Sequence, residues 1–407
     1  MSDLRPAVPP KSIAPASMPT GVWVLGFVSL LMDISSEMIH SLLPLFLVGT
    51  LGVSVLAVGI IEGLAESTAL ISKVFSGALS DFLGRRKGLA LLGYAMGALT
   101  KPVFALANGV GAVITARFID RVGKGIRGAP RDALLADITP PSIRGAAFGL
   151  RQSLDTVGAF AGPLLATGLM LVWAGDFRAV FWVAVIPGVL AVLLLLVGIH
   201  EPEHDRPRRA VNPIRREALA RLDRRYWWVV GVGSVFTLAR FSEAFLVLRA
   251  SQLAVPVAWV PLVMVAMNLV YAACAYPLGK LSDTMNRSAL LAAGMVVLLV
   301  SDLVLASASS WVGLGVGVAL WGVHMGMTQG LLAAMVADAA PEDLRGTAFG
   351  FFNLLSGLAL LASSIIAGVL WETMGSAFAF YAGAAFAALT LLGMVMRPPP
   401  ERHHAQS

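Results

Sequence analysis

One block of sequence occurs twice in this chain of 407 residues. Segment 77–86, GALSDFLGRR, returns as segment 279–288, GKLSDTMNRS, so the copies lie 202 positions apart and Arg85 aligns with Arg287. A second pattern, Ala-Asp followed by Arg-Gly-x-Ala-Phe-Gly, starts at residue 136 and returns 201 positions later. A repeat of this length in an apolar chain predicts two homologous membrane-embedded halves, a construction typical of secondary transporters.

The composition indicates that most of the surface meets lipid. Hydrophobic residues make up 57% and charged residues 13% of the chain, and the mean hydropathy is +0.80. Soluble domains carry about 25% charged residues. The single cysteine, Cys274, excludes an internal disulfide.

Twelve apolar stretches are long enough to cross a membrane, for which a helix needs roughly 20 residues. They lie near residues 22–48, 55–81, 87–108, 110–136, 145–172, 177–199, 227–253, 258–283, 288–307, 311–338, 346–372 and 376–396. We therefore expect an all-α membrane protein of two pseudo-symmetric six-helix bundles, an N-terminal half over 21–200 and a C-terminal half over 226–396.

The positions of arginine and lysine predict which helix ends face the cytoplasm. Four loops carry neither residue, namely those near 49–54, 108–110, 254–258 and 307–311. Cytoplasmic loops of membrane proteins are enriched in Lys and Arg, so the alternate loops, which carry these residues, are expected inside. Cytoplasmic segments are therefore predicted at 1–20, 201–225 and 397–407. The net charge of +6 then reflects topology, and no nucleic-acid partner is expected.

Ionisable residues within the spans are the main functional signal, because a charge at mid-bilayer is costly and usually faces a protein interior or water. Asp33, Glu37 and His40 are spaced i, i+4, i+7, which places them on one helical face of the first span. The repeat aligns Glu37 with Glu243 in the seventh span. We predict that Asp33, Glu37 or Glu243 carries a coupling proton, with His40 as a relay.

The fourth span carries a row of cations, and the seventh span adds another. Arginine grips carboxylates and phosphates through two parallel hydrogen bonds. The row therefore predicts a small-molecule cargo that bears negative charge. The expected substrate cavity comprises Arg117, Arg121, Lys124, Arg127, Arg131, Arg240, His324 and Gln329.

Further charges in the second and fifth spans are candidates for permanent charge pairs. Arg151 and Asp155 lie one turn apart in the fifth span. Glu62, Glu66 and Lys73 share a face of the second span, and Glu66 is expected to pair with Lys73. The alternative is that these charges contact cargo.

The repeated block resembles the signature loop of the major facilitator superfamily, and the resemblance covers nearly the whole chain. The first copy departs from the usual pattern at Phe82, where the family usually has arginine. The resemblance implies a monomer in the inner (cytoplasmic) membrane, with both termini cytoplasmic, that works by alternating access. Because the sequence contains no ATP-binding motif, an ion gradient is expected as the energy source, and no cofactor is expected. The resemblance also implies a cytoplasmic gate motif formed by Gly77, Asp81, Arg85, Arg86, Gly279, Asp283, Arg287, Arg144 and Arg345.

A second resemblance is partial. Gly158, Gly162 and Pro163 in the fifth span are similar to a glycine–proline motif associated with proton-coupled antiporters of this superfamily. The alternative is that these glycines only allow close helix packing. We expect a proton-coupled exporter of a small amphiphilic or anionic compound. The alternative is a proton symporter that imports a polar organic anion or a metal–organic complex.

Other classes of protein fit less well. An enzyme is not expected, because the sequence contains no zinc-protease, nucleophile-elbow or nucleotide-loop motif. Met264, Met267, Cys274 and His324 would suit a soft metal such as Cu(I), but methionine is also common in apolar helices, so no metal site is predicted. A receptor or scaffold that transports nothing is not expected, because the buried charges would then cost free energy without an evident packing role.

Overall fold

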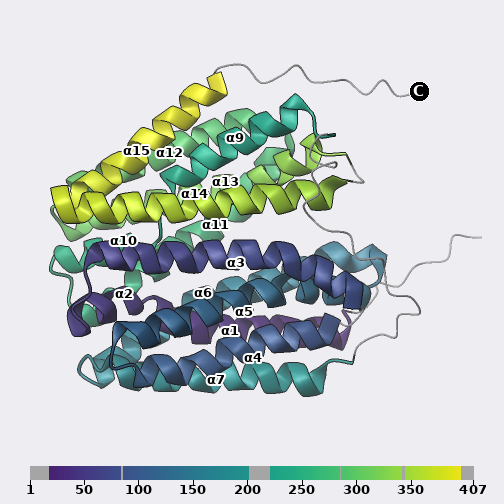
Figure 1. Ribbon diagram of the computed structural model, residues 1–407, viewed down its shortest axis with the longest axis horizontal. Helices are drawn as coiled ribbons and strands as arrows, with labels where there is room; N and C mark the ends of the chain where they lie inside the picture. Colours follow the sequence, from purple (N-terminus) through teal and green to yellow (C-terminus); the bar gives the residue numbers. More distant parts are fainter. Residues whose placement is uncertain (1–17, 84–85, 201–220, 285, 342–343, 396–407) are drawn as a thin grey trace, which may run out of the picture.

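The structure is a computed structural model that describes residues 18–83, 86–200, 221–284, 286–341 and 344–395, and the structural statements below refer to these residues. All regular structure within them is helical, as the sequence predicts (Figure 1). Most of the expected tails and of the linker over 201–225 lies outside the described residues.

The N-terminal half begins with a broken helix. Its elements are α1 (Thr20–His40), α2 (Leu43–Leu45), the π-helical turn η1 (Phe46–Thr50), α3 (Val55–Leu83), α4 (Arg86–Leu106), α5 (Val110–Asp137), the 3₁₀ turn η2 (Pro141–Ile143), α6 (Arg144–Val172) and α7 (Phe177–Gly198). Segments α1, α2 and η1 together form the first predicted span.

The C-terminal half repeats this order. Its elements are α9 (Arg224–Ala239), α10 (Ala244–Gln252), the 3₁₀ turn η3 (Val257–Trp259), α11 (Leu262–Thr284), α12 (Arg287–Ser307), α13 (Trp311–Ala339), α14 (Arg345–Met374) and α15 (Ser376–Val395). Segments α9 and α10 form the seventh predicted span, so both halves start with a broken helix.

Polar side chains cap several helix starts. Asp176 accepts hydrogen bonds from the backbone N–H groups of Arg178 and Ala179 at the start of α7. Asp223, Asn286 and Ser310 cap α9, α12 and α13 in the same way. Such caps satisfy N–H groups that have no partner within the helix, so they fix where these helices begin.

Eleven of these helical segments are long and apolar enough to cross a membrane. The fourth predicted span, α5, is missing from that set because its ionisable side chains lower its hydropathy. Helix α5 packs against α3 and α4, and both of these helices are apolar enough to cross a membrane. The charged helix therefore crosses the membrane among apolar neighbours.

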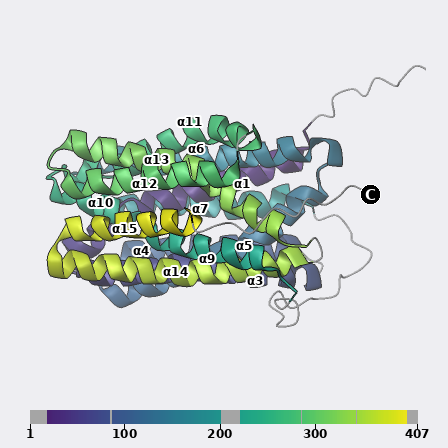
Figure 2. The ribbon, with the colours of Figure 1, turned by 90° about the horizontal axis from the view of Figure 1, so that it is seen from above.

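Two pairs of long helices form most of the contact between the halves. Figure 1 shows α14 beside α3, and Figure 2 shows α11 beside α6 on the opposite side of the molecule. Glycines permit the first contact: a methyl group at Gly59 would lie 2.5 Å from the Ser364 carbonyl oxygen, and one at Gly63 would lie 2.9 Å from the Ser364 Cβ. Small residues at such points let helix backbones approach closely in membranes.

We call the end of the bundle formed by α2, η1, α10 and η3 the outer end, and the opposite end the inner end. At the outer end Leu43, Phe46, Phe245 and Leu246 from both halves are fully buried in one apolar cluster. The halves are therefore sealed together at the outer end.

The inner end shows the repeat most directly and corrects its alignment by one residue. Arg86 begins α4 and pairs with Asp137 of α5, whereas Arg287 begins α12 and pairs with Asp338 of α13. Arg287 is thus the counterpart of Arg86, not of Arg85, and Arg287 follows Asp283 by four positions whereas Arg86 follows Asp81 by five.

Candidate functional site

A central cavity lies between the two halves. It has two adjoining parts of ≈ 500 Å³ and ≈ 470 Å³. Both parts include Glu37, Glu66, Leu70, Lys124 and Gln329 in their walls. The first part reaches His40 and the α9–α10 link, and the second extends toward the inner end.

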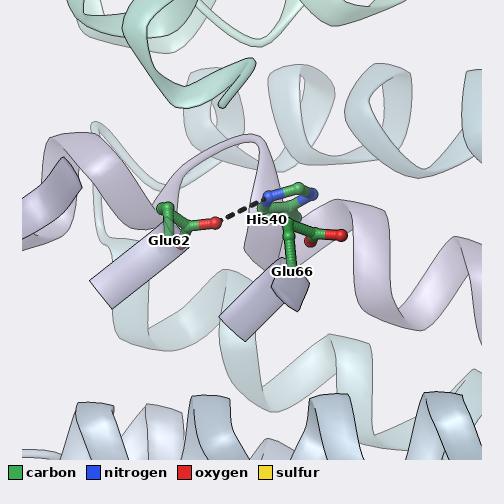
Figure 3. A group of neighbouring side chains, drawn as sticks. All are labelled: His40, Glu62 and Glu66. Atoms are coloured by element: carbon green, nitrogen blue, oxygen red, sulfur yellow. Dashed lines mark hydrogen bonds and ion pairs between the residues drawn. The ribbon is translucent and has the colours of Figure 1, made fainter. Parts of the chain in front are cut away.

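His40 connects the cavity wall to the interior of the N-terminal half. Its Nε2 lies 3.2 Å from Glu62 Oε2, and its Nδ1 lies 3.5 Å from Glu37 Oε2. Figure 3 shows the ring of His40 between Glu62 and the cavity-lining Glu66. The carboxyl oxygens of Glu62 and Glu66 and a ring nitrogen of His40 lie within 4.8 Å of one another. The imidazole thus bridges an acid in the cavity wall and one behind it.

Two arginines of α5 neutralise the acids of α3. Arg117 Nη2 donates to Glu62 Oε2 over 2.6 Å, and Arg121 Nη1 donates to Glu66 Oε1 over 3.0 Å. Arg121 also donates to Asp120 over 3.0 Å. Glu66 is thus paired with α5 and not with Lys73, so the prediction of a Glu66–Lys73 pair is wrong.

The same network explains why two predicted cavity residues do not line the central cavity. Arg117 and Arg121 are 3% and 1% exposed, and they point at the carboxylates between α3 and α5. Because α5 packs along α3, these two arginines face the helix interface. Their placement in the substrate cavity is therefore corrected.

Lys101 of α4 is part of this network and was not predicted. It donates to Asp120 Oδ1 over 2.9 Å and to the Ser36 hydroxyl of α1 over 3.1 Å. The available signal was a lysine beside Pro102 in an otherwise apolar span. The lysine links three helices through one buried cation.

Besides Lys73, three cations that line the cavity make no ion pair with a carboxylate among the described residues. Lys124 lines both parts of the cavity and makes no hydrogen bond or ion pair within the described chain. Arg127 lies over the Tyr94 ring at 4.9 Å, with its Nη1 buried and unpartnered. Arg240 lies over the Phe236 ring at 5.8 Å, with its Nε buried and unpartnered. Their charges are thus not neutralised by a bonded carboxylate.

Arg240 lies in the gap between α9 and α10. Residues 240–243 are not helical, and the Ser242 backbone N–H bonds to the Ser364 hydroxyl at 3.3 Å. Arg240, Phe241 and Glu243 line the first part of the cavity. Broken helices at the membrane centre are a common way to present polar groups to a substrate.

Toward the inner end, the cavity wall carries paired charges. Arg131 donates to the Ser29 hydroxyl and to Asp132 over 3.1 and 3.0 Å. Arg151 Nη1 donates to Asp155 Oδ2 over 2.6 Å. Asp33 lines this part of the cavity, as do Lys73, Arg131 and Asp155.

Two stretches of this chain, residues 25–254 and 232–407, match the sequence pattern of the Major Facilitator Superfamily. The chain belongs to the major facilitator superfamily. It is therefore a multi-pass membrane transporter of small molecules and not an enzyme.

Several proteins are similar to this chain over all or part of their length. An uncharacterized MFS-type transporter of Methanocaldococcus jannaschii is 33% identical over 86% of this chain and 88% of its own. The inner membrane transport protein YajR of Escherichia coli is 24% identical, with 93% and 83% covered. The multidrug resistance protein MdtH of Photorhabdus laumondii is 30% identical over 42% of each chain. A solved POT family transporter with 5-aminolevulinic acid has a TM-score of 0.78 at 13% identity, with 95% and 97% covered, and shows the shared fold.

The superfamily motifs have distinct positions in the structure. A methyl group at Gly158 would lie 2.9 Å from the Asp33 Cβ, and one at Gly162 would lie 2.8 Å from the Glu37 Cβ. The two glycines therefore bring α6 against the part of α1 that carries both acids, whereas Pro163 is buried inside α6.

The superfamily gate motif is only partly described. Gly77 and Asp81 lie in α3, and Gly279 and Asp283 lie in α11, but the side chains of Asp81 and Asp283 and all of Arg85 lie outside the description. Arg144 Nε donates to the Thr139 carbonyl oxygen, and Arg345 Nε donates to the Ala337 carbonyl oxygen of α13, each over 3.4 Å.

His324 does not line the cavity, which corrects its predicted position. It is fully buried, and its Nδ1 lies 2.8 Å from the Gly294 carbonyl oxygen of α12. Its ring lies between α12 and the Phe236 ring of α9, whose centroid is 5.6 Å away, whereas Gln329, just over one turn later, does line the cavity. His324 thus faces α12.

Proposed function

We propose that this transporter is a proton-coupled exporter of a small organic anion that works by alternating access. The observation that carries the proposal is the placement of Lys124 and Arg240. They face one cavity from opposite halves of the molecule, and neither is paired with a carboxylate. An anion held between them would join the halves, which gives the cargo a way to influence which conformation is favoured.

Proton coupling is supported by the acids of the same cavity. Glu37 and Glu243 line the cavity from opposite halves, and His40 lies between Glu37 and Glu62. Imidazole is suited to pass a proton, because each ring nitrogen can donate or accept. A proton that enters at Glu37 therefore has a path through His40 to Glu62.

Export is supported by two observations. The glycines of α6 follow the antiporter-like pattern and contact α1 at Asp33 and Glu37. A relative over part of the chain carries the name of a multidrug resistance protein. The inner membrane is the proposed location, because the relative YajR is named an inner membrane protein.

The test uses protein reconstituted in vesicles that contain a pH-sensitive dye, with one organic anion at a time as cargo. We expect an inward proton gradient to drive anion efflux, and Lys124→Met or Arg240→Met to abolish the efflux. Arg224→Gln removes an exposed cation at the start of α9 and is the matched control. Transport of neutral compounds with full activity of both variants would refute an anionic cargo. Gradient-driven uptake would identify a symporter.

A further inference from the structure

Asp302 of α12 is an isolated acid inside the C-terminal half. Its side chain is fully buried, and both carboxyl oxygens lack a hydrogen-bond partner among the described residues. An ionised carboxylate without a partner is very unfavourable in an apolar interior, so such groups stay neutral. The apolar packing around Asp302 therefore favours the protonated, neutral form of the side chain.

No charged side chain forms an ion pair with Asp302 among the described residues. Arg249 of α10 reaches the end of α12, where it donates to the Leu305 and Ala308 carbonyl oxygens and not to Asp302. The main packing partners of α12 are α13 and α15. Within α13 the ionisable residues are His324, which contacts the Gly294 carbonyl oxygen, and Asp338, which pairs with Arg287. In α15 the only one is the exposed Tyr381.

The Phe241 ring lies close to both Asp302 and the central cavity. A methyl group at Gly383 of α15 would lie 2.5 Å from Asp302 Oδ2 and 3.0 Å from Phe241 Cε1. The Asp302 carboxyl group and the Phe241 ring thus both lie next to Gly383. Phe241 lines the cavity and belongs to the non-helical link over 240–243. The ring packs against Phe245, Trp321 and Phe380. Because the link is not helical, a displacement of Phe241 would not require a helix to unwind.

We propose that Asp302 is a proton-binding site of the C-terminal half, reached from the central cavity past Phe241. When the ring moves aside, water enters, the Asp302 O–H bond breaks and the proton passes to that water. This inference deepens the proposed proton coupling and rests on it for its role in transport. Proton binding at Asp302 itself needs neither Glu37 nor an anionic cargo.

The test reads protonation directly, by infrared difference spectroscopy of the purified protein in lipid. We expect the wild type to show a protonated-carboxyl C=O band that Asp302→Asn lacks. Glu372→Gln, which changes an exposed acid of α14, should leave this band in place. A wild-type spectrum without a band specific to Asp302 would overturn the proposal, even if transport proved to be proton-coupled.

Access past Phe241 is tested with Asp302 intact. On transfer to heavy water, the band should shift as the carboxyl exchanges its proton, faster in Phe241→Ala than in the wild type. This measurement also serves if Asp302→Asn does not fold. A band that never shifts in either protein would show a permanently enclosed acid, and the proposal would be wrong.

Discussion

Lys101 donates a hydrogen bond to Asp120 over 2.9 Å inside the N-terminal half, and neither side chain is more than 3% exposed. Asp120 also accepts from Arg121, which in turn holds Glu66 at the cavity wall. The charged network of α5 is therefore anchored to α4 on its buried side. On its other side, Glu66 lines the central cavity. This arrangement gives the cavity acids fixed positions.

Removing the anchor should destabilise the protein. Lys101→Met leaves the buried Asp120 carboxylate short of one partner, and breaking a buried ion pair on one side costs about 3–5 kcal/mol of unfolding free energy. We expect a clearly lower thermal unfolding midpoint for the variant in detergent. Lys73→Met is the control, because Lys73 is exposed and makes no ion pair within the described residues. Equal midpoints for the two variants would contradict an anchoring role for Lys101.

The close approach of α6 to α1 gives a second prediction. Gly162→Ala places a methyl group 2.8 Å from the Glu37 Cβ and 2.9 Å from the Ile34 carbonyl oxygen. Overpacking of this kind costs about 1–3 kcal/mol, and here it also displaces an acid of the cavity. We expect reduced stability and reduced transport together. Gly168→Ala in the same helix meets no atom within 4 Å and should change neither.

The sequence predicted the spans well, because long apolar stretches and the loops between them are local features. All twelve predicted spans coincide with helical segments to within a few residues, and eleven of these segments are apolar enough to cross a membrane. The halves followed from the repeat, whose second copy includes Arg287. The one-residue error in its alignment became visible only when Arg86 and Arg287 were both found at helix starts.

Spacing within one helix predicted the Arg151–Asp155 pair, which the structure confirms. Charge partners on different helices could not be predicted in this way. Spacing within α3 suggested Glu66 with Lys73, but the partner of Glu66 is Arg121 in another helix. The choice depends on which helices are neighbours and how each is rotated, and a single sequence does not contain this information. Asp302 and Lys101 were missed because no other charged residue lies at helical spacing from either of them. An ionisable residue in a span was itself the signal.

The position of Glu37 gives a third prediction. Glu37→Gln keeps the shape of the side chain but removes the charge and the exchangeable acid proton. We expect the variant to fold normally and to lose transport driven by a pH gradient, measured in dye-loaded vesicles. Unchanged gradient-driven transport would remove Glu37 from the coupling role and leave Asp33 or Glu243 as the cavity acids to examine. Glu372→Gln is again the exposed control.

The sealed outer end gives a fourth prediction, tested by thiol labelling after Cys274→Ser. Gln329→Cys introduces a thiol into both parts of the central cavity. Ala250→Cys introduces one into α10, at a position that is fully buried in the outer seal. In the conformation described here, a small water-soluble thiol reagent should label residue 329 from the inner side and leave residue 250 unlabelled. Alternating access requires this order to change when the halves rock, so a cargo that favours the other conformation should protect residue 329. Rapid labelling of residue 250 from the outer side, without cargo, would show that the seal is not closed in the resting protein.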